Sequence, residues 1–275
     1  MFKINLALLY YAAKITLCSC TPEKVKGFEK IRDRSTITKI ATLPEVVNES
    51  SGLSMADSST FWTHNDSGGD NALYMVNKRG QLIDSLLVHH HINIDWEDLA
   101  KDDSGNLYIG DFGNNQNTRK DLAIIKIKDG KSEEIKFSYS HQSAFPPKKR
   151  EFDSEAFFHF NGQLHLFTKS WEKKNLVTKH YTIPDIAGTY ALTPKNILAL
   201  NEPVTSADIS PDKKTFVLLT YGKILLFRIE NKEIDFSTPL ACLKTRRKQT
   251  EAIAFDGNNK LLMTNEQGEL FEIIL

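Results

Sequence analysis

The chain has 275 residues, of which 35 are basic and 35 are acidic, so its formal net charge is zero. Apolar residues make up 40% of the chain and charged residues 25%, an ordinary composition for a soluble globular protein. The balanced charge excludes the strongly basic footprint of nucleic-acid-binding proteins, and we expect no nucleic-acid partner.

The first 19 residues have the features of a secretion signal. Lys3 precedes an apolar stretch from Ile4 to Ala13, which is too short to span a bilayer as a helix. Ser19 places a small residue directly before Cys20, as in bacterial lipoprotein signals. We therefore predict a signal peptide over residues 1–19 and a lipid on Cys20. The protein would then lie in the bacterial cell envelope, anchored to a membrane on the extracytoplasmic side. An ordinary secretory signal or an uncleaved anchor is the alternative.

Residues 20–35 are mostly charged and polar, which predicts a tether between the lipid and the folded domain. The three cysteines are Cys18, Cys20 and Cys242. Removal of Cys18 with the signal and acylation of Cys20 would leave Cys242 alone. We therefore expect no disulfide within the chain and a buried, apolar role for Cys242.

Residues 36–275 contain five repeats of one pattern. Each repeat opens with a short apolar-alternating segment, continues through a polar turn and leads into a second apolar run. These intervals of 46, 58, 52 and 44 residues between repeats are typical of propeller blades, which predicts an all-β fold, a β-propeller, over residues 36–275. The opening segments are Ser51-Gly52-Leu53, Glu97-Asp98-Leu99, Glu155-Ala156-Phe157, Ala207-Asp208-Ile209 and Glu251-Ala252-Ile253.

The number of blades depends on the two ends of this domain. The fifth repeat shows only three strands before the chain ends. A fourth strand is available at the other end, where Thr36 to Leu43 reads as alternating β before Pro44 stops it. Pairing this segment onto the last blade would close the ring and cover a sheet edge. The longest interval holds only an extra loop from Gln142 to Arg150. Five blades are therefore favoured, with six as the alternative.

The residues that enter the innermost strands are expected to meet near the central channel. Several of them are carboxylates, which repel one another unless a cation lies between them. All offer oxygen and none is His or Cys, which favours calcium or another hard divalent cation over zinc or iron. The alternative is that the acidic side chains accept backbone N–H bonds at strand starts. The predicted metal ligands are Ser51, Glu97, Glu155, Ser206 and Glu251.

The loops after the second strand of each blade are expected to open on the same face. Their side chains would surround a metal-plugged channel and form a polar pocket for a small ligand. Asn, Asp and Gly tolerate positive φ, so turn chemistry alone is the alternative, although it explains Lys169 and Tyr221 less well. The predicted pocket residues are Asp66, Asp111, Lys169, Tyr221 and Glu266.

The predicted ligand order resembles the calcium-binding ring of the calcium-activated nucleotidase (apyrase) family, five-bladed propellers with an ion in the channel. The segment Trp96-Glu97-Asp98-Leu99-Ala100, followed by Leu107-Tyr108-Ile109-Gly110, is also similar to that family. Repeats of the Ser-Gly-Leu and Glu-Ala-Ile kind resemble the SdiA-regulated family of bacterial propellers. These resemblances cover residues 36–275 and imply a five-bladed propeller with calcium in its channel.

Two functions fit these features. The first is a lipid-anchored binding or scaffolding module in which a channel calcium ties the blades together, with a small polar ligand or a protein as partner. The second is a metal-dependent hydrolase of phosphoanhydride or ester bonds. In it the ion would act as a Lewis acid, and Lys169 would stabilise developing charge. The two differ in whether an open coordination position of the ion faces solvent.

Overall fold

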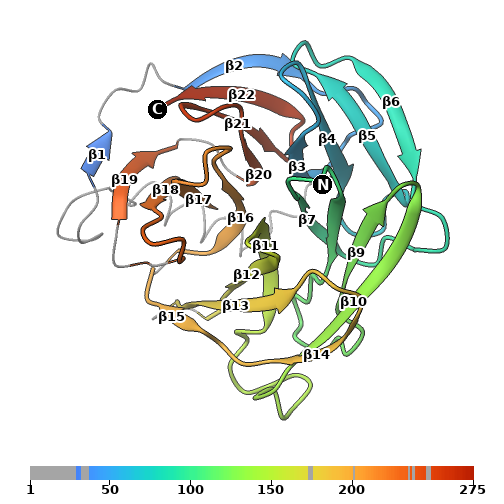
Figure 1. The fold of residues 1–275 in the computed structure, drawn as a ribbon, viewed down its shortest axis with the longest axis vertical. Helices are drawn as coiled ribbons and strands as arrows, with labels where there is room; N and C mark the ends of the chain where they lie inside the picture. The colour runs from blue at the N-terminus through green and yellow to red at the C-terminus, as the bar shows by residue number, and fades with distance from the viewer. Residues whose placement is uncertain are drawn as a thin grey trace, which may run out of the picture.

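The computed structural model describes residues 29–31, 37–172, 176–200, 202–234, 236, 239–245 and 249–275. The predicted signal peptide and Cys20 lie outside these residues. The described chain is built from β-strands that form five sheets arranged around a central axis (Figure 1). The predicted all-β fold and five-bladed propeller are confirmed, and the six-bladed alternative is wrong.

The blades are numbered by the order of their inner strands, and within each blade the strands run from the axis outward in antiparallel order. Blade one contains β3 (Ser50–Met55), β4 (Thr60–Asn65), β5 (Ala72–Asn77) and β6 (Leu82–Leu87). Blade two contains β7 (Trp96–Lys101), β8 (Leu107–Asp111), β9 (Ala123–Lys128) and β10 (Lys131–Tyr139). Blade three contains β11 (Asp153–Phe160), β12 (Gln163–Lys169), β13 (Thr178–Pro184) and β15 (Asn196–Leu198). Blade four contains β16 (Val204–Ile209), β17 (Thr215–Thr220), β18 (Lys223–Arg228) and β19 (Pro239–Lys244).

The fifth blade is assembled from both ends of the domain. It contains β20 (Thr250–Phe255), β21 (Lys260–Asn265), β22 (Glu269–Ile274) and, on its outer edge, β2 (Ile37–Thr42). β2 pairs antiparallel with β22, from Ile37 opposite Ile273 to Thr42 opposite Glu269. The predicted closure of the ring by the N-terminal strand is confirmed.

Two blades carry an additional strand that the sequence pattern did not predict. β14 (Gly188–Leu192) pairs parallel with β10 on the outer edge of blade two, and β1 (Glu29–Ile31) pairs parallel with β19 on the outer edge of blade four. Both strands cover edges whose N–H and C=O groups would otherwise lack partners. The predicted tether over residues 20–35 therefore contains three residues that belong to a blade.

The hydrophobic core consists of separate layers between neighbouring blades rather than one central mass. Five clusters of buried side chains are present, one at each junction between adjacent blades. The cluster between blades two and three includes Tyr108, Phe157 and Tyr181, which are fully buried. Because alternate side chains of a strand point to opposite faces, each middle strand contributes to two such layers. This packing holds the inner strands in a ring.

Tight turns return the chain between neighbouring strands of a blade. Asn161 and Gly162 join β11 to β12 with φ values of 52° and 72°. Positive φ at both central residues matches the right-handed twist of a two-residue hairpin, and Asn followed by Gly is the pair that adopts it most readily. The polar dipeptide therefore fixes the direction of β12.

Cys242 on β19 is buried, with 1% of its surface exposed, as the sequence analysis predicts. It is also disulfide-bonded. The prediction of a chain without a disulfide is wrong, because it assumed that both other cysteines were removed or acylated. Among the described residues no helix is long and apolar enough to cross a membrane.

Candidate functional site

Every inner strand contains a β-bulge close to the point where it enters the channel. The pairing register between the first and second strands skips one residue in β3, β11, β16 and β20, and two residues in β7. Bulges redirect side chains out of the regular pleat and are common beside functional sites. The skipped residues are Ser51, Glu97, Asp98, Glu155, Thr205 and Glu251.

Four of the five predicted metal ligands, Ser51, Glu97, Glu155 and Glu251, are thus bulge residues. In blade four the bulge falls on Thr205, one position before the fifth predicted ligand, Ser206. Ser206 instead donates a hydrogen bond to Asp98 Oδ1 over 3.1 Å. Ser51 donates to the Glu97 carbonyl oxygen over 2.8 Å, and Thr205 donates to the Thr250 carbonyl oxygen over 2.8 Å. All three hydroxyl groups already have protein partners.

Asp98, which the sequence analysis did not select, connects three inner strands at the axis. Its carboxylate accepts hydrogen bonds from Phe157 N at 3.1 Å, Ala207 N at 3.2 Å and Ser206 Oγ at 3.1 Å, besides its neighbour Leu99 N at 2.9 Å. Burial raises the pKa of Asp98 well above its usual range, while these hydrogen bonds act in the opposite direction. Because amide N–H groups can only donate, the surroundings of Asp98 match a carboxylate anion.

Two further carboxylates lie two residues before a bulge. Asp95 precedes Glu97, and Asp153 precedes Glu155, so the motif Asp-x-Glu occurs in blades two and three. The sequence analysis missed both aspartates, although this repeated spacing was available as a signal. Gly113 packs directly against the first pair, since a Cβ there would lie 2.1 Å from Glu97 Oε1 and 2.4 Å from Asp95 Cγ. A larger residue at position 113 would displace these carboxylates.

Asp66, Asp95 and Glu97 form an outer carboxylate group. One oxygen from each lies within 4.8 Å of the others, a spacing that could hold a metal ion. Asp66 and Asp95 are partly exposed, whereas Glu97 is 6% exposed. Burial raises the pKa of Glu97 well above its usual range, and the charges of Glu155, Asp66, Asp153 and Asp95 act in the same direction. Carboxylates gathered in this way repel one another unless a cation lies between them, so this group has the features of a cation site.

Glu97 also belongs to an inner carboxylate group with Asp153 and Glu155, again with oxygens within 4.8 Å of one another. All three side chains are buried. The two Asp153 oxygens accept hydrogen bonds from Asn114 N and from Trp171 Nε1. Glu155 Oε1 lies 2.9 Å from Lys169 Nζ in an ion pair. The inner group therefore has side-chain partners in Trp171 and Lys169, whereas Asp66 of the outer group accepts a hydrogen bond from its neighbour Ser67 N over 2.6 Å.

Lys169 lies at the centre of the predicted pocket. Its ammonium group is 3.3 Å from Tyr221 Oη and lies over the rings of Trp171 and Tyr221, at 4.8 Å and 5.2 Å from their centroids. Desolvation lowers the pKa of Lys169, but Glu155, Tyr221 and further acidic neighbours raise it well above its usual range. Lys169 is consequently a buried ammonium ion rather than a neutral amine.

The structure brings together four of the five predicted pocket residues and places the fifth at the edge. Asp66 and Glu266 interact electrostatically with Lys169 and with each other, beside Tyr221. Asp111 forms an ion pair of 2.9 Å with Arg119, and its Oδ1 accepts a hydrogen bond from Asp95 N. Asp111 therefore contacts the backbone of Asp95 and helps to hold the outer group in place.

Burial and mutual repulsion raise the pKa of most acidic groups in this region. The pKa of Asp95 rises to about 7, first through burial and then through the charges of Asp66 and Asp153. The pKa of Glu251 rises to about 8, mainly through burial. Burial also raises the pKa of Glu97 and Glu155 well above the usual range. A bound cation would reverse this tendency by favouring the ionised forms.

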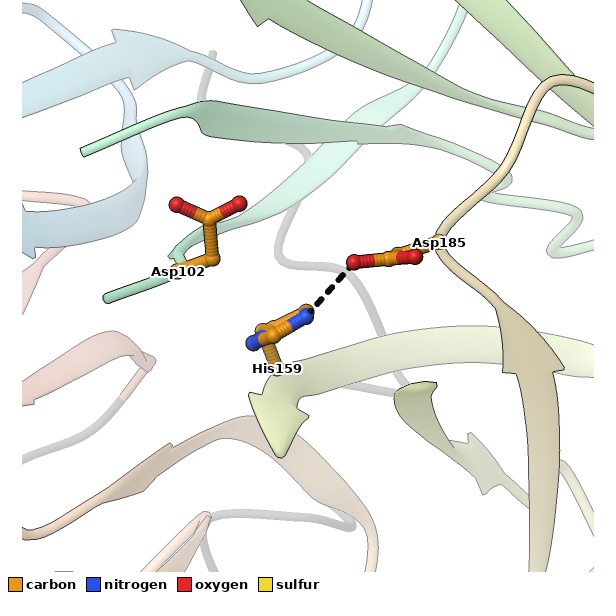
Figure 2. A group of neighbouring side chains, drawn as sticks. All are labelled: Asp102, His159 and Asp185. Carbon is orange, nitrogen blue, oxygen red and sulfur yellow. Dashed lines mark hydrogen bonds and ion pairs between the residues drawn. The ribbon is translucent and has the colours of Figure 1, made fainter. Parts of the chain in front are cut away.

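A third group with metal-ligand chemistry lies near the other ends of β7 and β11, with one member just after β13. It consists of Asp102, His159 and Asp185, and Figure 2 shows His159 directed at Asp185 with Asp102 beside them. The His159 Nε2 to Asp185 Oδ2 distance is 2.9 Å, and Tyr108 Oη donates to Asp102 Oδ2 over 3.0 Å. Asn106 donates from its backbone N to Asp102 Oδ1 and from Nδ2 to Asp102 Oδ2. Since Asp102 is five residues beyond Glu97, this group lies roughly 16 Å from the channel carboxylates. It links blades two and three.

Comparison with known proteins gives a likeness in fold alone. The sequence matches no protein-family model and no curated protein. Among solved structures, a gluconolactonase from Xanthomonas campestris is similar with a TM-score of 0.47 and 12% identity, over 86% of this chain and 78% of that one. The β-propeller domain of Cps50 (Swd1) from Myceliophteria thermophila has a TM-score of 0.45 and 9% identity, over 87% and 99%. A chain of the mitotic checkpoint complex has a TM-score of 0.43 and 13% identity, over 81% and 60%.

In the presence of a chelator, we expect the free energy of unfolding to fall by about 2 kcal/mol between pH 6.5 and 8. Asp95 and Glu251 have folded-state pKa values of about 7 and 8, above their ordinary values near 4. Groups raised in this way hold extra protons in the folded state, so their stabilising contribution is lost as the pH rises through the folded pKa. Urea unfolding across this range measures the slope.

Glu251→Gln is the matched variant for this titration, because glutamine has a similar shape and no ionisable proton. It should remove the larger part of the pH dependence and leave the part that belongs to Asp95. Two results would show that these carboxylates do not titrate as their burial requires. One is a pH dependence of Glu251→Gln equal to that of the wild type, and the other is a wild-type free energy of unfolding that rises between pH 6.5 and 8.

Proposed function

We propose that this protein is a lipid-anchored extracytoplasmic propeller that binds a hard divalent cation, such as calcium, at the mouth of its channel. In this proposal the protein acts as a binding or scaffolding module for a small polar ligand or a protein partner. The observation that carries the proposal is the outer group of Asp66, Asp95 and Glu97, in which one carboxylate oxygen from each residue lies within 4.8 Å of the others and Glu97 is buried.

The donor set favours a hard ion. Every candidate ligand is a carboxylate oxygen, the type that calcium and magnesium prefer, and no His or Cys is in either channel group. The acidic side chains here outnumber the basic ones, which are Lys169 and Arg119, and Arg119 is already paired with Asp111. A divalent ion would offset the repulsion that raises the pKa of Asp95 and Glu97.

The same features keep a second function under consideration, a metal-dependent hydrolase of phosphoanhydride or ester bonds. Asp66 and Asp95 are partly exposed, so an ion held by them would have one side toward solvent. When bound, such an ion supplies Lewis-acid chemistry. Lys169 would lie beside it with a fixed positive charge and could stabilise an oxyanion. The resemblance to calcium-activated nucleotidases and SdiA-regulated propellers agrees with either function.

We expect calcium at one hundred times its dissociation constant to stabilise the fold by about 2.7 kcal/mol. For a domain of this size, each kcal/mol raises the melting midpoint by about 2–4 °C, so the midpoint should rise by roughly 5–10 °C. Glu97→Gln should abolish most of this rise, because Glu97 is shared by both carboxylate groups. Glu133→Gln, an exposed glutamate on β10, should respond like the wild type.

The proposal is contradicted if chelator and calcium give the same wild-type midpoint, or if Glu97→Gln retains the full response. An activity screen then separates the two functions. Purified protein is tested against nucleotides, phosphoesters and lactones with and without calcium. Turnover that needs calcium and disappears in Glu97→Gln supports the hydrolase, whereas calcium binding without turnover supports the binding module.

The proposed lipid anchor rests on the sequence from Leu17 to Cys20. Cells grown with a labelled fatty acid should yield labelled wild-type protein, and Cys20→Ser should carry no label. Since cleavage would remove Cys18 and acylation would use the Cys20 sulfur, the anchored protein would carry Cys242 as a reduced thiol in place of its disulfide. Label that persists in Cys20→Ser would contradict the proposed lipid on Cys20.

A further inference from the structure

The two channel carboxylate groups form a continuous arrangement with Glu97 as their common member. Carboxylates shared between adjacent oxygen clusters are suited to bridging two cations. Of the basic groups here, Lys169 is in direct contact with the inner group, whereas Lys169 and Arg119 act on Asp66 and Asp95 of the outer group through their charges alone. The ammonium group of Lys169 lies 2.9 Å from Glu155 Oε1 and also acts on the charges of Asp153 and Glu251.

The surroundings of Lys169 fix its ammonium group at this place. Lys169 is 5% exposed, and the rings of Trp171 and Tyr221 face its charge. Trp171 in turn donates its indole N–H to Asp153, so one aromatic side chain contacts both the cation and a carboxylate of the inner group. A cation held over aromatic rings and against a carboxylate is attracted by both.

The inner oxygens depend on this charge. Glu155 Oε1 is buried in a side chain that is 2% exposed, and it contacts the ammonium group of Lys169 at 2.9 Å. The charges of Asp153 and Glu251 raise the pKa of Glu155, whereas the charge of Lys169 lowers it. Without the ammonium ion, the Glu155 carboxylate would face the charges of Asp153 and Glu251 with no compensating cation.

We propose that Lys169 is a built-in cation that occupies the inner carboxylate group and limits the channel mouth to one divalent ion, bound by Asp66, Asp95 and Glu97. The residues Glu97, Asp153 and Glu155 then form a latent second ion site. This inference rests on the proposed cation-binding function. It makes Lys169 the residue that sets the number of ions bound.

Neutralising Lys169 should therefore convert the protein from one bound calcium ion to two. Equilibrium dialysis with radioactive calcium and titration calorimetry measure the number of ions per chain. We expect one ion in the wild type, two in Lys169→Ala, one in Lys169→Arg, which keeps the charge, and one in Lys169→Ala combined with Glu155→Gln. The melting midpoint of Lys169→Ala should also fall in chelator and rise more on addition of calcium than that of the wild type.

The possible outcomes separate this inference from the function on which it rests. No calcium bound by the wild type contradicts the proposed function itself. One ion in both the wild type and Lys169→Ala, or two in the wild type, overturns the role of Lys169 and leaves cation binding intact. Lys169→Gln serves as a second variant of similar length. If neither variant folds even with calcium present, the inference is also wrong, because an ion should replace the missing ammonium group.

Discussion

Replacing Asp98 by alanine will lower the free energy of unfolding by about 3–6 kcal/mol. The substitution leaves the N–H groups of Phe157 and Ala207 and the hydroxyl group of Ser206 without their acceptor. Each buried donor left unsatisfied costs about 1–3 kcal/mol. Since domains are typically stable by only 5–15 kcal/mol, this loss is a large share of the total. Chemical denaturation of the wild type and the variant measures it.

Asp103→Ala is the control for this experiment. Asp103 is a neighbouring aspartate whose side chain is 81% exposed and whose contact is an ion pair with Lys213. Surface substitutions of this kind change stability by about 0.5 kcal/mol or less. If Asp98→Ala is as stable as Asp103→Ala, the hydrogen bonds of Asp98 do not hold β7, β11 and β16 together.

Deletion of residues 37–42 will abolish cooperative folding or cause aggregation. Without β2, the full length of β22 becomes an exposed edge next to the buried side chains Leu270 and Phe271. Unpaired edges of this kind pair with other chains. The loss also opens the ring, so blades one and five keep only the contacts of their inner strands and the cluster between them. Size-exclusion chromatography and thermal unfolding report the result.

The double variant Ile37→Val and Ile40→Val controls for the side chains of β2. It keeps the backbone ladder with β22 and removes only one methylene group from each side chain. Such a change costs about 0.5–1.5 kcal/mol at a buried isoleucine and less at these two half-buried ones. This variant should remain monomeric and unfold cooperatively. A monomeric, cooperatively unfolding deletion variant would contradict the closing role of β2.

The sequence was sufficient to predict the five blades and the closing strand, because both leave local patterns. The anchor segments recur at blade-like intervals, and the fifth repeat lacks a strand that residues 36–43 supply. β14 and β1 have no such pattern. They pair parallel with strands from distant parts of the chain, and Gly188–Leu192 in particular is set by its contact with β10 rather than by its own composition.

The site was predicted less completely, because bulges and hydrogen-bond partners are properties of the folded chain. Glu97 and Glu155 lie in one carboxylate group, but Asp66, Asp95 and Asp153 complete the two groups in place of Ser51, Ser206 and Glu251. Lys169 pairs with Glu155 in the inner group. In blade four the bulge shifts the equivalent position from Ser206 to Thr205. Asp98 was read only as part of a repeat.

The inner strands are joined at the axis by protein groups. A channel ion was expected to join the blades, whereas the Asp98 carboxylate accepts hydrogen bonds from backbone N–H groups of two other inner strands. Ser206 extends this network to blade five, because its Oγ accepts a hydrogen bond from Ile253 N at 3.1 Å. A cation at Asp66, Asp95 and Glu97 would therefore add to a ring that protein groups already connect.

A crystal structure of the protein equilibrated with calcium tests the central claim most directly. We expect one calcium ion at the channel mouth, with carboxylate oxygens of Asp66, Asp95 and Glu97 at about 2.3–2.6 Å. Density for an ion only at Asp102, His159 and Asp185, or no ion near Glu97 at saturating calcium, would contradict the assignment of this propeller as a cation-binding protein.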